Sequence, residues 1–168
     1  MIILGIDPGI ANTGYGIVES NGSHVKHLQL GHIRTDAKTP SEMRLKHIYD
    51  TLIELIHQYN VDTVVLEDIF FSKNVSNAYV VGEVKGIVKL AAACNDAPVT
   101  TYTPLQVKQA VVGYGKATKK QVQKMVQMLL KLKELPKPDH AADALAITIC
   151  HARSHKLRSI QEKLMQRS

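Results

Sequence analysis

The chain has 168 residues, of which 45% are hydrophobic, and a formal net charge of +6 at pH 7. This size and apolar content allow one domain with a real core, and no apolar run is long enough to cross a bilayer. Asp7-Pro8-Gly9 interrupts the early apolar run, which argues against a signal peptide. We therefore expect a cytoplasmic protein without membrane contact, and the basic charge favours an acidic partner.

The N-terminal part of the sequence predicts an antiparallel meander of three strands. Residues 2–6 are a short apolar run that ends at Asp7, just before a Pro-Gly turn, as in a buried strand. Residues 15–18 continue into a second strand, the Asn-Gly pair at 21–22 is a strong hairpin signal, and residues 27–34 supply a third strand. Asp7 is therefore expected at the C-terminal end of the first strand.

A helix and a further strand follow the meander. Ser41 is a fair N-cap, an apolar stripe at helical spacing comes after it, and Asn60 ends the helix. The β-branched run 61–66 then predicts a buried strand with Glu67 at its end. Because the connection is a helical crossover, this strand should run parallel to an earlier one. We expect Glu67 beside Asp7, at the edge where open α/β sheets bind ligands.

The remaining sequence predicts alternating helices and a strand. We expect a helix over 77–95, a strand over 99–103, and helices that begin near Leu105, Thr118 and Asp139. These complete an α/β fold with a mixed five-stranded sheet, flanked by helices. We assign residues 1–153 to one domain and residues 154–168 to a basic C-terminal tail, for which a short helix and a frayed end are both open.

The helix after Pro138 carries a second set of polar candidates. His140 and Asp143 lie about 60° apart around a helix axis and share a face, while Asp139 and Asp143 are about 40° apart. Spacing alone leaves open which residue accompanies Asp143. We favour His140, and interpret Asp139 as the N-cap whose side chain turns onto the helix's own amides.

Together, Asp7, Glu67, His140 and Asp143 suggest one metal site. Each acid taken alone is more often a solvated or capping group. Carboxylates brought together raise one another's pKa, so a fold that gathers them usually contains a cation. Hard oxygen ligands suit Mg²⁺ or Mn²⁺, and two such ions about 4 Å apart can activate water and stabilise the leaving oxygen in a phosphodiester displacement.

The stretch from Thr103 to Lys137 is strongly basic. Glu134 is its only acid until Asp139, and its cations are Lys108, Lys116, Lys119, Lys120, Lys124, Lys131, Lys133 and Lys137. Such a bias fits a surface that follows phosphates. A solvated helix face is the alternative, and we accept it for Lys131, Lys133 and Lys137.

Several separated motifs resemble the bacterial RuvC family of Holliday-junction resolvases, in the family's order and spacing from about Ile2 to about Ala152. The motifs are residues 3–9 with 13–16, Glu67 with Phe70 and Lys73-Asn74, residues 106–109 with 111–113, and residues 141–146. The resemblance implies an RNase H-like fold and a homodimer. It also implies a divalent-metal endonuclease that nicks two strands of like polarity symmetrically at a four-way DNA junction, in recombination and repair.

Site roles follow from the same resemblance. Asp7, Glu67 and Asp143 match the family's metal-binding carboxylates, with two Mg²⁺ ions expected per site and Mn²⁺ able to substitute. Many members carry Asp three residues before Asp143, and some carry His, as this chain does at His140. Imidazole suits Mn²⁺ better than Mg²⁺, and His140 could instead transfer protons.

The resemblance also suggests DNA contacts. Lys108 and Lys119 match basic positions near the scissile strand, and we assign Lys73 and Asn74 to DNA with them. Phe70 either belongs to the core or stacks on an unpaired base, and we assign it to DNA. A branch-migration helicase complex is a further partner that the family implies.

Three alternatives remain open from the sequence. Residues 5–9 with 13–16 also resemble the first phosphate loop of actin-like ATPases, although those need two such domains and have no place for the Asp143 motif. The chain could also bind junctions without cutting them. The third alternative is an RNase H-like nuclease that acts on structured RNA.

Overall fold

The computed structural model describes residues 1–22, 24–68 and 75–165. Its sheet has five strands in the order β3-β2-β1-β4-β5. The strands are β1 (Ile2–Asp7), β2 (Asn12–Ser20), β3 (Val25–Arg34), β4 (Thr63–Glu67) and β5 (Val99–Tyr102). The expected mixed five-stranded sheet with an antiparallel meander is confirmed.

The register of the sheet explains why two carboxylates meet. β1 pairs antiparallel with β2, so that Asp7 lies opposite Gly14. β1 also pairs parallel with β4, and Ile6 lies opposite Leu66. The next residue on each of these two strands is the acid, Asp7 on β1 and Glu67 on β4. Both therefore end at the same edge of the sheet, as the crossover rule predicts.

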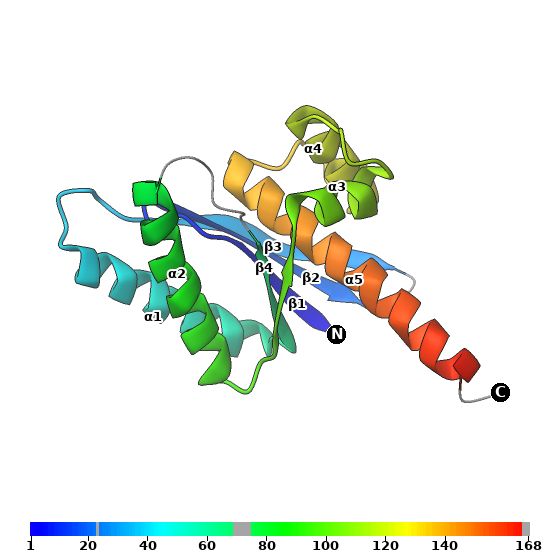
Figure 1. Ribbon diagram of the computed structural model, residues 1–168, viewed down its shortest axis with the longest axis horizontal. Helices are drawn as coiled ribbons and strands as arrows, with labels where there is room; N and C mark the ends of the chain where they lie inside the picture. The colour runs from blue at the N-terminus through cyan, green and yellow to red at the C-terminus, as the bar shows by residue number, and fades with distance from the viewer. Residues whose placement is uncertain (23, 69–74, 166–168) are drawn as a thin grey trace.

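Helices cover both faces of the sheet (Figure 1). On one face lie α1 (Ser41–Tyr59) and α2 (Val75–Ala93), which pack on a core that includes Leu4, Ile6 and Val64. On the other face, α5 (Asp139–Met165) crosses the sheet. The short helices α3 (Pro104–Val112) and α4 (Lys119–Leu129) pack against α5 and enclose a second core that includes Ile3, Val65 and Leu145. Neighbouring residues of a strand thus face different cores, as the period of two requires.

The ends of the helices show which capping residues could be predicted from the sequence. Asn60 ends α1 in the left-handed region with φ of 48°, as expected. Ser41, however, is the first helical residue, and the cap position is held by Pro40 without a side-chain hydrogen bond. The prediction of a Ser41 N-cap was wrong, because Pro40 already has the extended backbone of a cap residue. In contrast, Thr103 and Thr118 each form a full capping box.

Helix α5 is longer than its predicted core segment. It continues without a break past Arg153 to Met165, so the backbone of the predicted tail is helical through that residue. The helix α2 begins at Val75 and ends at Ala93, two residues earlier at each end than expected. None of the helices in the described ranges combines the length and the apolar character that crossing a membrane demands.

Helix α5 lies unusually close to the sheet because glycines face it. A Cβ atom added at Gly5 would lie 2.3 Å from the carbonyl oxygen of Ala144, and one at Gly14 would lie 2.2 Å from that of His140. Real Cβ atoms do not make such contacts, so any side chain at either position would push the helix away. Gly5 on β1 and Gly14 on β2 therefore allow the first turns of α5 to lie directly against these two strands.

Candidate active site

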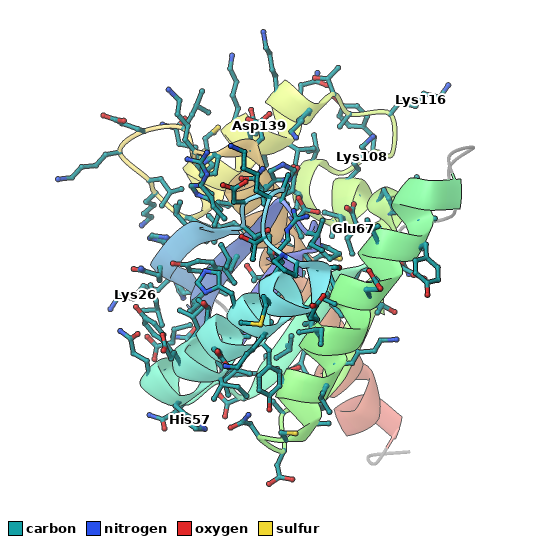
Figure 2. All side chains as sticks on the ribbon, turned by 90° about the vertical axis from the view of Figure 1, so that its left-hand side faces the viewer. Lys26, His57, Glu67, Lys108, Lys116 and Asp139 are labelled. Atoms are coloured by element: carbon teal, nitrogen blue, oxygen red, sulfur yellow. The ribbon has the colours of Figure 1, made fainter. Side chains whose placement is uncertain are left out.

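The four residues expected to form one site lie around one edge of the sheet. Asp7 and Glu67 end the neighbouring strands β1 and β4, and the first turns of α5 carry His140 and Asp143. Figure 2 shows Glu67 in the same part of the molecule as Lys108 and Asp139, beside helices α3 and α4. This convergence comes from segments far apart in the sequence.

Asp7 and His140 form a direct pair. The Nδ1 atom of His140 lies 2.7 Å from Oδ2 of Asp7, so the ring N–H donates to the carboxylate. The Asp7 side chain is only 13% exposed, whereas that of His140 is 47% exposed. Burial raises the pKa of Asp7, and the hydrogen bond from His140 opposes that increase. The imidazole thus favours the charged form of a carboxylate that has little contact with water.

The surroundings of Glu67 oppose its charged form more strongly than those of Asp7 do. Burial, followed by the charges of Asp7 and Asp143, raises the pKa of Glu67 to about 7. Lys85 and Lys108 lower the pKa of Glu67, but by less than burial and the two carboxylates raise it. Within the described residues, no hydrogen bond or ion pair holds the Glu67 carboxylate. A cation placed beside it would therefore gain a strong electrostatic interaction.

Asp143 and Asp139 share one lysine. The Nζ atom of Lys119 lies 3.0 Å from Oδ2 of Asp143 and 3.4 Å from Oδ2 of Asp139. Gln123 Nε2 also donates to Oδ1 of Asp139 over 3.0 Å. These contacts join the first turn of α5 to the first turns of α4.

The structure corrects the interpretation of Asp139 as the N-cap of its own helix. The amides of Ala141 and Ala142, in the first turn of α5, donate to the carbonyl oxygen of Pro138 and not to the Asp139 side chain. The Asp139 side chain turns instead to Lys119 and Gln123, because α4 places two donors within reach of it. Sequence reasoning had no signal for Gln123, whose role depends on how two helices pack.

A small cavity links the carboxylates to two of the predicted DNA contacts. It has a volume of about 180 Å³, and its polar wall consists of Glu67, Asp143, Lys108 and Lys119. Negative groups that suit a cation and positive groups that suit a phosphate therefore border the same space. Phe70, Lys73 and Asn74, the other predicted DNA contacts, lie outside the described residues.

The described side chains of the candidate active site pair with one another and are not arranged around a metal position. Among residues 1–22, 24–68 and 75–165, no three His, Cys, Asp or Glu side chains are grouped so that they could hold a metal ion. His140 engages Asp7, and Lys119 engages Asp143, so each of these carboxylates already has a positive or donor partner. The donor set still fits a hard divalent cation, since it offers carboxylate oxygens and contains Glu67, which has no such partner among the described residues.

Comparisons with known proteins agree with this geometry. The model of the family "Crossover junction endodeoxyribonuclease RuvC" matches residues 3–151. A curated member from Alkaliphilus metalliredigens is 52% identical over 160 residues, which are 95% of this chain and 98% of that protein. A member from Clostridioides difficile is 52% identical over 157 residues, which are 94% of this chain and 93% of that protein.

Solved structures give the same result. Thermus thermophilus RuvC in complex with Holliday junction substrate is 39% identical, with a TM-score of 0.90, over 94% of this chain and 96% of that chain. The yeast mitochondrial Holliday junction resolvase Ydc2 is 16% identical, with a TM-score of 0.69, over 99% of this chain and 86% of that chain, and shows the fold alone.

The sheet order and the carboxylates at its edge define an endonuclease of the RNase H-like class. The chain belongs to the RuvC family of crossover junction endodeoxyribonucleases. The expected family, fold class and enzyme class are thereby confirmed. Because the family match spans most of one domain, the similarity of residues 5–16 to an ATPase phosphate loop does not indicate an ATPase fragment.

Proposed function

We propose that this endonuclease resolves Holliday junctions by metal-dependent hydrolysis, with Asp7, Glu67 and Asp143 as its metal ligands. The observation that carries the proposal is the cavity whose wall combines Glu67 and Asp143 with Lys108 and Lys119. A family of crossover junction endodeoxyribonucleases and a relative in complex with a Holliday junction support the substrate.

The carboxylates would hold Mg²⁺, with two ions per site and with Mn²⁺ able to substitute. Bound divalent ions supply Lewis-acid activation of water and stabilise the leaving oxygen of a phosphodiester. Binding requires Glu67 to lose its proton, and it requires Asp143 to exchange Lys119 for a cation. His140, which is hydrogen-bonded to Asp7, would orient that carboxylate or bind an ion directly.

The lysines would position the DNA backbone. Lys108 and Lys119 border the cavity and carry the charge that a scissile strand needs nearby. If Asp143 held a cation, the Nζ atom of Lys119 would keep only Asp139 as its ion-pair partner within the described residues and could bind a phosphate. We extend the DNA contact to Phe70, Lys73 and Asn74 on the family resemblance alone, with the Phe70 ring stacked on an unpaired base.

Two strands must be cut to resolve a four-way junction, and each chain contributes one set of carboxylates. We therefore infer a homodimer, in which two sites act symmetrically on strands of like polarity. A branch-migration helicase complex is proposed as the partner that moves the junction. The cytoplasm, where bacterial DNA lies, is the proposed location.

The decisive experiment is a cleavage assay on a synthetic four-way junction with and without Mg²⁺. We expect paired nicks at symmetric positions with the metal and none after chelation. A linear duplex of the same sequence is the control for structure specificity, and a folded RNA tests the RNA alternative. Tight junction binding without any product in Mg²⁺ or Mn²⁺ would favour a protein that binds junctions without cutting them.

A further inference from the structure

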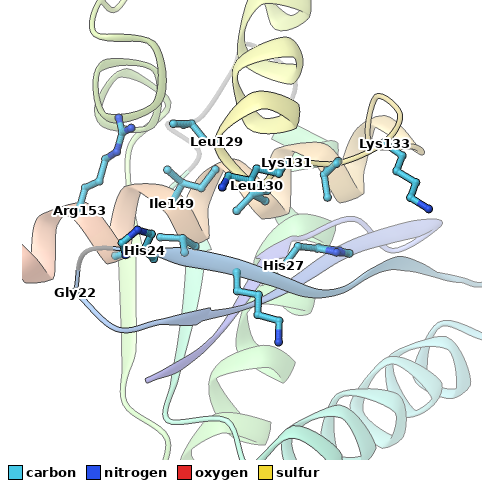
Figure 3. A pocket seen from close by; sticks show the side chains of 13 residues that line it. Gly22, His24, His27, Leu129, Leu130, Lys131, Lys133, Ile149 and Arg153 are labelled. Carbon is cyan, nitrogen blue, oxygen red and sulfur yellow. The ribbon is translucent and has the colours of Figure 1, made fainter.

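A second and larger cavity lies at the opposite end of the sheet from the carboxylates. It has a volume of about 790 Å³ (Figure 3). It is lined by Gly22, by His24 and the start of β3, by residues 129–133 at the end of α4 and after it, and by α5 between Ile149 and Arg153. We call it the β3 pocket. The distance from Asp143 to Ile149, the first lining residue on α5, is about 9 Å at 1.5 Å per residue, and the two cavities share no lining residue.

The rim of the β3 pocket is basic. Lys131, Lys133, His24 and Arg153 contribute to its lining, and the described lining residues include no acid. Neither Lys131 nor Lys133 forms an ion pair with any residue of the described ranges, and both are exposed. Arg153 is partly engaged, since its guanidinium donates to the carbonyl oxygen of Ala110. Two lysines are therefore available for an acidic ligand.

The floor of the β3 pocket is apolar. Leu130, Ile149 and Ala152 belong to the buried core beneath it, and Val25 and Leu132 pack against that core while remaining partly exposed. An apolar side chain of a ligand placed here would remove its own surface and the surface of the floor from water. This burial would favour binding by about 25 cal/mol per Å² buried. The pocket thus offers apolar burial as well as charge.

One buried polar atom inside the pocket lacks a partner. The Nε2 atom of His27 is buried and makes no hydrogen bond within the part of the chain that the structure describes, although most buried polar groups in native structures do. Figure 3 shows the His27 ring on β3, below the segment that carries Lys131 and Lys133. A carbonyl or carboxylate oxygen of a bound molecule would satisfy this nitrogen once the His27 ring turns to expose it to the pocket.

The strand beside the pocket is also open to pairing. β3 is the outermost strand of the sheet, with β2 on one side and no strand among the described residues on the other. Such an edge presents backbone groups to which an extended peptide can add.

We propose that the β3 pocket binds an acidic peptide segment of a protein partner, with an apolar side chain on its floor and carboxylates against Lys131 and Lys133. DNA is the obvious alternative for a basic surface. A duplex presents phosphates and sugars, which would satisfy the lysines but leave the floor of Val25, Ile149 and Leu132 unfilled. A peptide with alternating acidic and apolar residues matches the rim, the floor and the open strand edge together.

Binding can be tested with a short fluorescein-labelled peptide in which leucines alternate with glutamates. We expect its anisotropy to report binding to the full chain, and the double variant Lys131→Glu, Lys133→Glu to weaken that binding at least about tenfold, since like charges then face each other. Lys38→Glu, an exposed charge reversal outside the pocket, is the matched control. A peptide with serines in place of the leucines should bind at least about tenfold more weakly to the wild-type chain, because it cannot fill the floor.

The site of binding is checked independently by NMR. The peptide should shift the methyl resonances of Val25 and the ring resonances of His27, and leave those of His140 unchanged. Junction cleavage by the double variant should equal that of the wild type, and its melting temperature should show that it is folded.

Three results would overturn the proposal. They are absence of binding to the wild-type chain, equal binding to the double variant, and a double variant that loses junction affinity while it keeps peptide affinity. The last result would assign the β3 pocket to DNA.

Discussion

Asp7 and Glu67 occupy equivalent positions at the ends of two parallel neighbouring strands, yet their surroundings differ. Asp7 accepts a hydrogen bond from His140, whereas Glu67 has no such partner among the described residues and its pKa is raised to about 7. For Asp7, the hydrogen bond from His140 thus offsets part of the increase in pKa that burial causes. Glu67 is poised to be neutralised, by a proton when the site is empty and by a cation when it is filled.

The largest effect is expected when Asp7 loses its charge. Asp7→Asn should lower junction cleavage by at least about a thousandfold, because several kcal/mol of metal-based stabilisation disappear. Junction affinity should stay within about twofold, since it depends mainly on phosphate contacts. Both are measured on one four-way junction, with the exposed Asp50→Asn as control. Normal nicking by Asp7→Asn would remove Asp7 from the metal site.

Glu67→Gln should also reduce cleavage, by about a hundredfold or more, but with a gain in stability that Asp7→Asn lacks. The pKa of Glu67 is about 7 in the folded chain against an ordinary 4.5. Between these values the folded chain keeps a proton that the unfolded chain has lost, so stability falls as the pH rises through this window. Glu67→Gln has no ionisable group at this position, so it does not lose stability in this pH range.

Denaturant unfolding measures this difference. At about pH 8, Glu67→Gln should be more stable than the wild type by about 1 to 2 kcal/mol, a figure reduced for solvent screening, and the gain should vanish below about pH 4.5. Asp7→Asn should show no comparable gain, because it leaves His140 without its carboxylate. Equal pH profiles for the two variants would mean that His140 does not distinguish the two carboxylates.

His140→Asp should make the surroundings of Asp7 more like those of Glu67. If His140 binds metal, the variant should stay active and its ratio of Mn²⁺ to Mg²⁺ rates should fall about tenfold, since oxygen replaces nitrogen as ligand. The assay compares both ions across pH, with the exposed His32→Asp as control. An unchanged ratio together with a lost titration near neutral pH would instead indicate proton transfer by His140.

The smallest effect is expected at Lys119, which pairs with Asp143. Lys119→Ala should weaken junction binding by only a few-fold and reduce the slope of log affinity against log salt by about one. It should also lower the Mg²⁺ concentration needed for half-maximal cleavage, because Asp143 no longer exchanges a lysine for a cation. Lys124→Ala, on the exposed side of α4, is the control. An unaltered salt slope would remove Lys119 from the DNA contact.

The sheet edge was predictable because strand periodicity and crossover rules act on residues close in sequence. Short apolar runs located Asp7 and Glu67 at strand ends, and the crossover rule placed them side by side. Helix caps were harder to predict from the sequence. Pro40 and Ser41 are adjacent, and sequence patterns place a helix end only to within a residue or two. Thr118 shows the favourable case, where a side chain and the residue three positions later confirm each other.

The contacts between helices could not be predicted in the same way. Whether Asp139 caps its own helix or reaches Gln123 depends on the packing of α4 against α5, which no local pattern encodes. The β3 pocket has the same origin, because three separate segments form it. Lys131 and Lys133 were interpreted from the sequence as solvated residues, and in the structure they are exposed yet border a pocket with an apolar floor.

The close approach of α5 to the sheet has a consequence for ion size. Mg²⁺ binds oxygen at about 2.0 to 2.1 Å, and Ca²⁺ at about 2.3 to 2.6 Å. Since the carbonyl oxygen of His140 lies where a side chain at Gly14 would stand, Gly14→Ala should move the first turn of α5, and Asp143 with it, away from Asp7. We expect the wider site to bind Ca²⁺ relatively better, which competition between the two ions in the cleavage assay would measure. Relatively tighter Ca²⁺ binding by Gly14→Ala would show that the missing side chain on β2 limits the size of the ion that the carboxylates accept.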